Sequence, residues 1–239
     1  VDINGDGDVI VFSTNQRGSG FGENVKRPYV EAYYLDMTTD PLTGPPEWKL
    51  KGSKIELDLG TNLANEVSAY RVSVSINRVG DMIAIGDTEN NKVLVFKYSD
   101  QTQEWIQMGE TLVSNELHDD DFGNSVKLNK SGSVLVVGAP EHDAKFIGAH
   151  FVKEESTNNC GAVYIYQWNG SEWAAFSDMP IQGRRHEDIK LEGVSSQHEN
   201  NTANIISADI KSDRYGYSVA INESGNAVIV GVPMFGGDE

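Results

Sequence analysis

The chain of 239 residues lacks the features that mark disulfide-bonded, membrane-spanning or nucleic-acid-binding proteins. Its single cysteine, Cys160, cannot form a disulfide within the chain, which favours an intracellular protein or an extracellular one that relies on its core. No segment approaches the roughly 18 apolar residues of a membrane-spanning helix. Lys and Arg number 19 against 36 Asp and Glu, and the net charge of -17 argues against nucleic acid as a partner.

The chain also begins without an initiator methionine or a signal peptide. Because its first residue is Val1, we expect it to be a processed chain or an excerpt. Hydrophobic residues make up 38% of the sequence, which is enough for a folded domain with a large core.

Four segments of the sequence align without gaps. They read VDINGDGDVIVFS from Val1, VSINRVGDMIAIG from Val74, VKLNKSGSVLVVG from Val126 and VAINESGNAVIVG from Val219. Each predicts a short strand, an Asn-x-x-Gly turn and an apolar strand. The Asn side chain can bond back to the backbone, and the Gly accepts a left-handed conformation, as in a hairpin with a type I turn and a Gly bulge. The turn residues are Asn4 and Gly7, Asn77 and Gly80, Asn129 and Gly132, and Asn222 and Gly225.

A second half of the repeat follows each of the first three hairpins. It holds an apolar or aromatic strand (YVEAYYLD, KVLVFKYSD or GAVYIYQWNG) and then a Glu-Trp pair at Trp48, Trp105 or Trp173. This spacing predicts four antiparallel strands per unit, the fourth starting at the Trp. Repeated four-stranded units are typical of a β-propeller, an all-β fold of four-stranded antiparallel blades. The alternative is a large β-sandwich with accidental internal similarity.

The third and fourth units resemble the FG-GAP repeat, the blade unit of integrin-α-type propellers. Phe122-Gly123 and Gly138-Ala139-Pro140 have both motifs of that repeat in full, and the fourth unit has Tyr215-Gly216 and Gly231-Val232-Pro233. The second unit departs from the pattern, with Tyr70-Arg71 and Gly86-Asp87, and the first lacks its opening residues. The resemblance implies a seven-bladed propeller on a secreted or cell-surface protein that binds partners.

The repeats divide the chain into four parts. Residues 1–69 predict a blade lacking its start, 70–120 a blade, 121–213 a blade with long loops, and 214–239 the start of a further blade. Three to four blades would leave apolar faces and strand edges exposed. We therefore expect residues 1–239 to be a partial propeller, part of a longer protein.

The acidic residues near Val1 could belong either to a calcium-binding loop or to a tight turn. Asp2, Asn4, Asp6 and Asp8 alternate as oxygen ligands would, but position nine of a calcium loop is the apolar Ile10. The alignment places Asp2 within a strand. The turn is therefore the predicted structure and no cofactor is expected, although Asp6 and Asp8 could hold calcium weakly at the surface.

Other stretches have ordinary structural interpretations. HDDDFG, from His118, is interpreted as a solvated acidic loop rather than a metal site. RGSGFGENV, from Arg17, is interpreted as a connector, because no helix follows to bind phosphate. Cys160 precedes a strand with no His nearby to activate it. The recurring Trp residues favour packing at the outer strand over sugar stacking.

Four Asn-x-Ser/Thr sequons start at Asn129, Asn169, Asn200 and Asn222. Asn169 and Asn200 should be exposed and could carry glycans in a secreted protein. Asn129 and Asn222 are weaker candidates, because their amides are expected to bond within turns.

The sequence favours a non-enzymatic, extracellular or cell-surface propeller module that serves as a scaffold for adhesion, protein–protein interaction or assembly. Its partners would be other protein subunits or the rest of its own longer chain. Two alternatives stay open. One is a polysaccharide-acting enzyme with two converging carboxylates, and the other is a glycan-binding lectin, for which Trp168 is the nearest testable aromatic residue.

Overall fold

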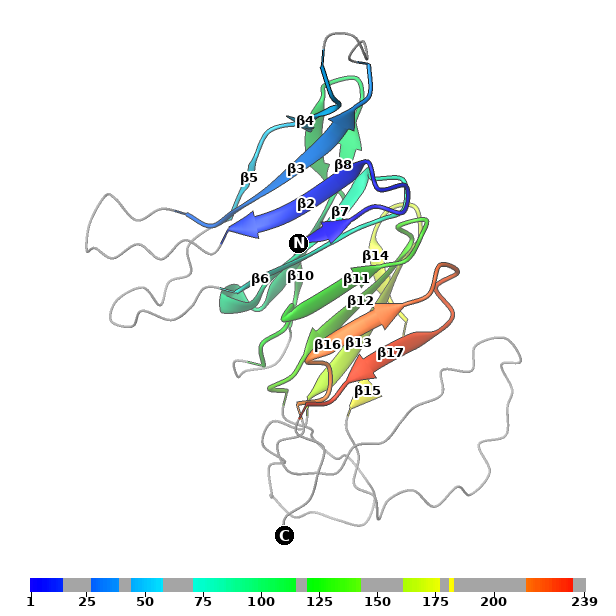
Figure 1. Ribbon diagram of the computed structural model, residues 1–239. Helices are drawn as coiled ribbons and strands as arrows, with labels where there is room; N and C mark the ends of the chain where they lie inside the picture. The colour runs from blue at the N-terminus through cyan, green and yellow to red at the C-terminus, as the bar shows by residue number, and fades with distance from the viewer. Residues whose placement is uncertain are drawn as a thin grey trace, which may run out of the picture.

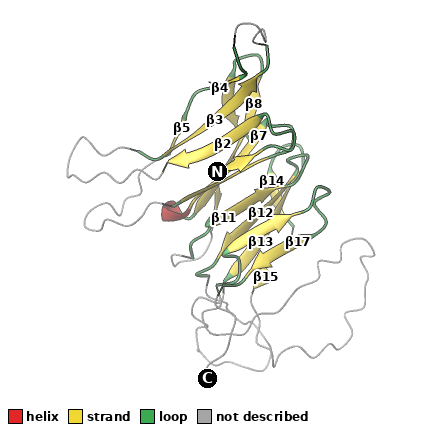
Figure 2. Cartoon of the chain, viewed as in Figure 1, coloured by secondary structure: helices red, strands yellow, loops and turns green. Residues whose placement is uncertain are grey.

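The computed structural model describes residues 1–14, 27–38, 44–57, 71–114, 120–142, 161–176, 181–182 and 214–233. In this part of the chain the fold is all-β, and the one helical element is a short 3-10 turn, η1, at Thr88–Asn90. The predicted all-β class is therefore confirmed. Figure 2 shows the strands as a series of separate sheets joined by loops.

Within these described ranges, seventeen strands form four antiparallel sheets. The first sheet contains β1 (Asp2–Ile3), β2 (Val9–Thr14), β3 (Tyr29–Asp36), β4 (Glu47–Leu50) and β5 (Ile55–Glu56). The second contains β6 (Val72–Ile76), β7 (Met82–Asp87), β8 (Lys92–Ser99), β9 (Glu104–Gln107) and β10 (Leu112–Val113). The third contains β11 (Ser125–Leu128), β12 (Val134–Ala139), β13 (Ala162–Trp168), β14 (Trp173–Ala175) and β15 (Ile181–Gln182). The fourth contains β16 (Ser218–Ile221) and β17 (Val228–Gly231).

Each of the first three sheets has the strand order of a propeller blade. The first four strands of the first sheet pair in sequence, β1 with β2, β2 with β3 and β3 with β4, and the other two sheets repeat these pairings. The registers repeat as well, since Ser13, Gly86 and Gly138 pair with Val30, Val93 and Val163.

The outer strand of each blade is broken, which the sequence did not predict. β4 pairs with the end of β3, whereas β5 pairs with its beginning, and the same division separates β9 from β10 and β14 from β15. Gly52 and Gly109 lie at the break in the first two sheets with φ of 75° and 79°. A residue with positive φ inserted into a strand is typical of a β-bulge, so the fourth strand is a bulged strand rather than a continuous one.

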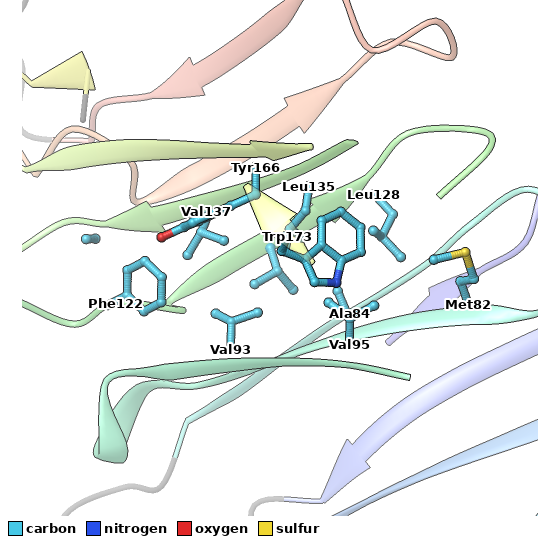
Figure 3. Packing of buried hydrophobic residues seen from close by; sticks show 12 residues of the cluster. Met82, Ala84, Val93, Val95, Phe122, Leu128, Leu135, Val137, Tyr166 and Trp173 are labelled. Carbon is cyan, nitrogen blue, oxygen red and sulfur yellow. The ribbon is translucent and has the colours of Figure 1, made fainter. Parts of the chain in front are cut away.

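The four sheets stack face to face, with their first strands β1, β6, β11 and β16 side by side (Figure 1). Alternate residues of each strand face opposite neighbours, so a central sheet is apolar on both sides. All six residues of β7 are buried for this reason. Figure 3 shows the core between the second and third sheets, where Met82, Ala84, Val93 and Val95 face Leu135, Val137, Tyr166 and Trp173.

This arrangement is that of β-propeller blades. Antiparallel four-stranded sheets packed face to face through apolar residues, with the first strands adjacent, define the fold. The described residues provide three blades and the first hairpin of another.

Candidate interaction surfaces

The Asn-x-x-Gly segments form the same turn in all four sheets. In the second sheet, Asn77 Oδ1 accepts hydrogen bonds from the backbone N–H groups of Gly80, Asp81 and Met82, each at 3.1 Å. The fourth residue, Gly7, Gly80, Gly132 or Gly225, has φ between 75° and 80°. That conformation needs Gly, so the spacing of Asn and Gly follows from the backbone of the turn.

The four turns lie side by side in what we call the turn row. Backbone hydrogen bonds run along it, from Gly5 N to Arg78 O, from Arg78 N to Lys130 O and from Lys130 N to Glu223 O, at 3.1 to 3.3 Å. Asn77 and Asn129 are buried in the row, whereas Asn222, in the last turn, is exposed. Each of the first three turns is therefore covered by the turn of the following blade.

Charged side chains also connect the turn row. Arg78 lies 2.9 Å from Glu223 and 3.6 Å from Asp6, and Lys130 lies 3.1 Å from Glu223. Lys130, with a smaller contribution from Arg78, lowers the pKa of the Glu223 carboxyl below its ordinary value. Glu223 thus ties the last hairpin to the two preceding turns through exposed ion pairs.

The acidic residues of the first turn have separate partners. Asp2 Oδ2 accepts hydrogen bonds from Lys127 Nζ at 2.7 Å and from the backbone N–H of Ile76 at 3.0 Å. Asp8 Oδ1 accepts one from Asn4 Nδ2 at 2.7 Å. Asp2 therefore lies at the blade junction rather than in a loop with Asp6 and Asp8. In the described part of the chain no group of three or more His, Cys, Asp or Glu residues is arranged to hold a metal ion.

The interpretation of HDDDFG as a solvated acidic loop is wrong for Asp120. Its side chain is buried at 1% exposure, where Oδ2 accepts a hydrogen bond from Ser114 Oγ at 2.6 Å and Oδ1 accepts one from Phe122 N at 3.2 Å. His142 Nδ1 lies 3.6 Å from Asp120 Oδ2, and the Tyr164 hydroxyl lies 3.3 Å from the same nitrogen of His142. The Asp120 carboxylate thus links Ser114, which follows β10, to the backbone that leads into β11.

Close contacts between glycines join neighbouring blades at the FG and GAP motifs. A Cβ on Gly86 would lie 2.0 Å from Gly123 O, and one on Gly138 would lie 1.9 Å from Gly216 O. Ser73 Oγ and Ser125 Oγ donate to these same carbonyl groups at 2.7 and 2.9 Å. The motifs are visible in the sequence, but this contact between them was not predicted. One signal in the sequence could have indicated it. The first unit has Ser13 at the position of Gly86 and Gly138, and the unit that follows it lacks the FG pair.

Two of the three repeated Trp residues pack between blades. Trp105 Nε1 donates to Lys51 O at 2.7 Å, and Trp173 Nε1 donates to Met108 O at 3.0 Å. Both acceptors directly precede the bulge glycines of the preceding sheet. Trp168 packs against Trp173 with ring centres 5.5 Å apart. The aromatic residue considered for glycan binding is therefore part of the packing between blades. Trp48, in the first sheet, is 45% exposed.

The structure separates the sequons by exposure. Asn169 is exposed in the turn between β13 and β14, where its Oδ1 accepts hydrogen bonds from the N–H groups of Ser171 and Glu172. Asn129 is 3% exposed and is covered by Gly225, whereas Asn222 is exposed. Asn200, Cys160, the Gly-rich connector and most of the two long insertions lie outside the described residues.

Comparisons with known proteins add little to this description. No family model and no curated protein matches the chain. Among solved structures, Hsv2 of Kluyvelomyces marxianus is similar over 64% of this chain and 67% of its own, with 12% identity and a TM-score of 0.25. This likeness carries no argument, and the fold assignment rests on strand order and sheet stacking. Within the described ranges no helix is long and apolar enough to cross a membrane.

Proposed function

We propose that this chain is a non-enzymatic propeller module of an extracellular or cell-surface protein, of the FG-GAP type, that serves as a scaffold for adhesion or assembly. The observation that carries the proposal is the use of polar side chains at the blade junctions. Asp2, Ser73 and Ser125 each bond to a backbone group of a neighbouring blade. Polar groups used in this way hold blades in fixed register, which suits a rigid scaffold.

The proposed partner-binding end is the one opposite the turn row. The second strand of each blade ends there and the third strand begins there, and the connections between blades attach to the same end. The two longest insertions of the sequence attach at this end, after Glu141 and after Gln182. Long loops on a rigid scaffold are where binding residues concentrate in proteins.

Adhesion of coated beads tests the scaffold proposal. Beads coated with the chain should adhere to cells of the source organism, and adhesion should fall when residues 183–212 are replaced by the shorter connection, residues 114–119. A matched control is Val79→Asp, because Val79 is exposed in the turn row at the opposite end. Loss of adhesion in the control, with none in the loop variant, would contradict the proposed binding end.

Location and glycosylation are tested separately. In intact source cells, a membrane-impermeant biotin reagent should label the protein, and peptide mass spectrometry should find glycan on Asn169 rather than on the buried Asn129. Labelling that appears only after lysis, together with unmodified sequons, would rule out the extracellular assignment.

A further inference from the structure

The first sheet has one face without a neighbour among the described residues, which we call the front face. Val11, Val30 and Ala32 point the other way and pack against the second sheet. The alternate positions Ile3, Ile10, Phe12 and Tyr33, together with Trp48, therefore make up the front face.

The positions of the front face are core positions in the other blades. Ile3 is 52% exposed, whereas Ile76 and Leu128, at the same repeat position, are 5% and 4% exposed. Ile83 occupies the position of Ile10 and is fully buried against the first sheet. The residue types are thus those of a blade junction, and only the neighbour differs.

The register places Trp48 in the same way as its two counterparts inside the stack. Trp48 pairs with Leu35, Trp105 with Tyr98 and Trp173 with Trp168, which are equivalent positions in the three sheets. In the two interior cases the indole lies against a bulge of the preceding sheet. A Cβ on Gly52 would be 2.9 Å from the Trp105 ring, and one on Gly109 would be 3.0 Å from Trp168 and 3.1 Å from Trp173.

We propose that the front face docks a further four-stranded blade, with Trp48 as the anchor. The inference rests on the proposed assembly role and names the partner. That blade carries a bulged outer strand in which a free carbonyl, the acceptor for Trp48 Nε1, precedes a Gly of positive φ. The Gly is required because a side chain at this position would occupy the space of the indole.

A second copy of this chain does not fit this description. Its two glycine bulges already hold its own Trp105 and Trp173, and the corresponding face of its third sheet holds β16 and β17. The net charge of -17 also opposes self-association. The partner is therefore a separate blade of the same repeat chemistry with an unfilled bulge.

An extended chain tests the docking directly. Residues 71–125 are repeated ahead of Val1, so that the added copy of Gly109 precedes the first sheet in the same frame as in the interior junctions. Peptide mass spectrometry after brief hydroxyl-radical oxidation should show Trp48 oxidised several-fold faster than Trp105 in the 239-residue chain. In the extended chain the rate at Trp48 should fall to that of Trp105.

The matched control is the same extended chain with Gly109→Val in the added copy alone. In this control the oxidation of Trp48 should stay as fast as in the 239-residue chain. Fast oxidation of Trp48 in the unsubstituted extended chain, whatever the state of the added unit, overturns the proposal.

A second measurement needs no added unit. Trp48→Ser in the 239-residue chain should leave the urea midpoint unchanged, whereas an equal loss for Trp48→Ser and Trp105→Ser would make Trp48 a core residue and also overturn it. Bead adhesion of the 239-residue chain is unaffected by either result, so a failure here is distinguishable from failure of the scaffold proposal.

Discussion

The second hairpin and the last hairpin have nearly the same sequence pattern in very different surroundings. Ala84 in β7 is fully buried, whereas Ile229, at the same repeat position in β17, is 73% exposed. Asn77 is buried beneath the turn of the third blade, whereas Asn222 has no such cover among the described residues. Burial at these two repeat positions is therefore decided by the following blade and not by the hairpin itself.

The comparison teaches that stability in this chain is concentrated at blade junctions. A single blade leaves both faces apolar and gains a core only by stacking, as in other repeat proteins. Substitutions at matched positions should therefore have large effects inside the stack and small ones at its ends. Four pairs of variants test this expectation, beginning with the largest effect.

Gly138→Ala and Gly231→Ala should differ most. The new Cβ on Gly138 would meet backbone, Gly216 O at 1.9 Å, whereas at Gly231 the close atom is Ser218 Oγ, the end of a rotatable side chain. We expect a loss of about 3 kcal/mol in the free energy of unfolding for Gly138→Ala, and a much smaller one for Gly231→Ala. Urea denaturation measures both. Equal losses in the free energy of unfolding for the two variants would show that contact at the blade junction does not determine the destabilisation.

Removing the turn amide should have the next largest effect. Asn77→Ala leaves the backbone N–H groups of Asp81 and Met82 without their acceptor in a buried turn, whereas Gly80 N keeps its bond to the carbonyl of residue 77, and we expect a cost of about 2 kcal/mol. Asn222→Ala should cost less than about 1 kcal/mol, because water can replace the lost bonds at an exposed turn. Thermal denaturation of the two variants gives the comparison, and a larger loss for Asn222→Ala would refute it.

The indole hydrogen bond should have a smaller effect. Trp105→Phe keeps an aromatic ring but removes the bond to Lys51 O, at an expected cost of about 1 kcal/mol. Trp48→Phe, at the uncovered end, should be neutral. Urea midpoints distinguish the two, and a neutral Trp105→Phe would mean that packing alone holds the indole.

Glu223→Gln should have the smallest effect, and it should depend on pH. Lys130 and Arg78 lower the pKa of Glu223, so its stabilising contribution is present above the ordinary carboxyl pKa and is lost as the pH falls through the lowered value. Glu223→Gln should speed amide hydrogen exchange in β17 at neutral pH and low salt, and less in high salt. Asp100→Asn, an exposed change in the turn after β8, is the control and should leave exchange in β17 unaltered.

Local features of the fold were predictable from the sequence. The Asn-x-x-Gly turns need only a side-chain acceptor and a residue that tolerates positive φ, and both are visible as letters at fixed spacing. The alternation of apolar residues likewise predicts the two strands on either side of each turn. Packing of the repeated Trp could be expected as well, because the residue recurs at one position of the repeat.

Contacts across junctions were not predictable in the same way. The break in the outer strand places Gly52 and Gly109 against indole rings of the next blade, and neither glycine gave a local signal that distinguishes a bulge from a loop. In the sequence Asp120 looks solvated, because one Asp residue lies on each side of it. In the fold its surroundings come from Ser114, His142 and Tyr164, which lie elsewhere in the chain. Asn129 is buried and Asn222 is exposed, but their two sequons are similar, so this difference could not be predicted from the sequence.

The sequence alone determined the turns, the strand alternation and the number of repeated hairpins, because each depends on interactions among residues a few positions apart. The tertiary structure decided which of these repeated residues are buried and which faces stay uncovered, since a blade face acquires its surroundings from a sheet some 50 or more residues away along the chain. The positions of Trp48 and Ile229 at the two ends of the stack follow from that stacking and from nothing in their own hairpins.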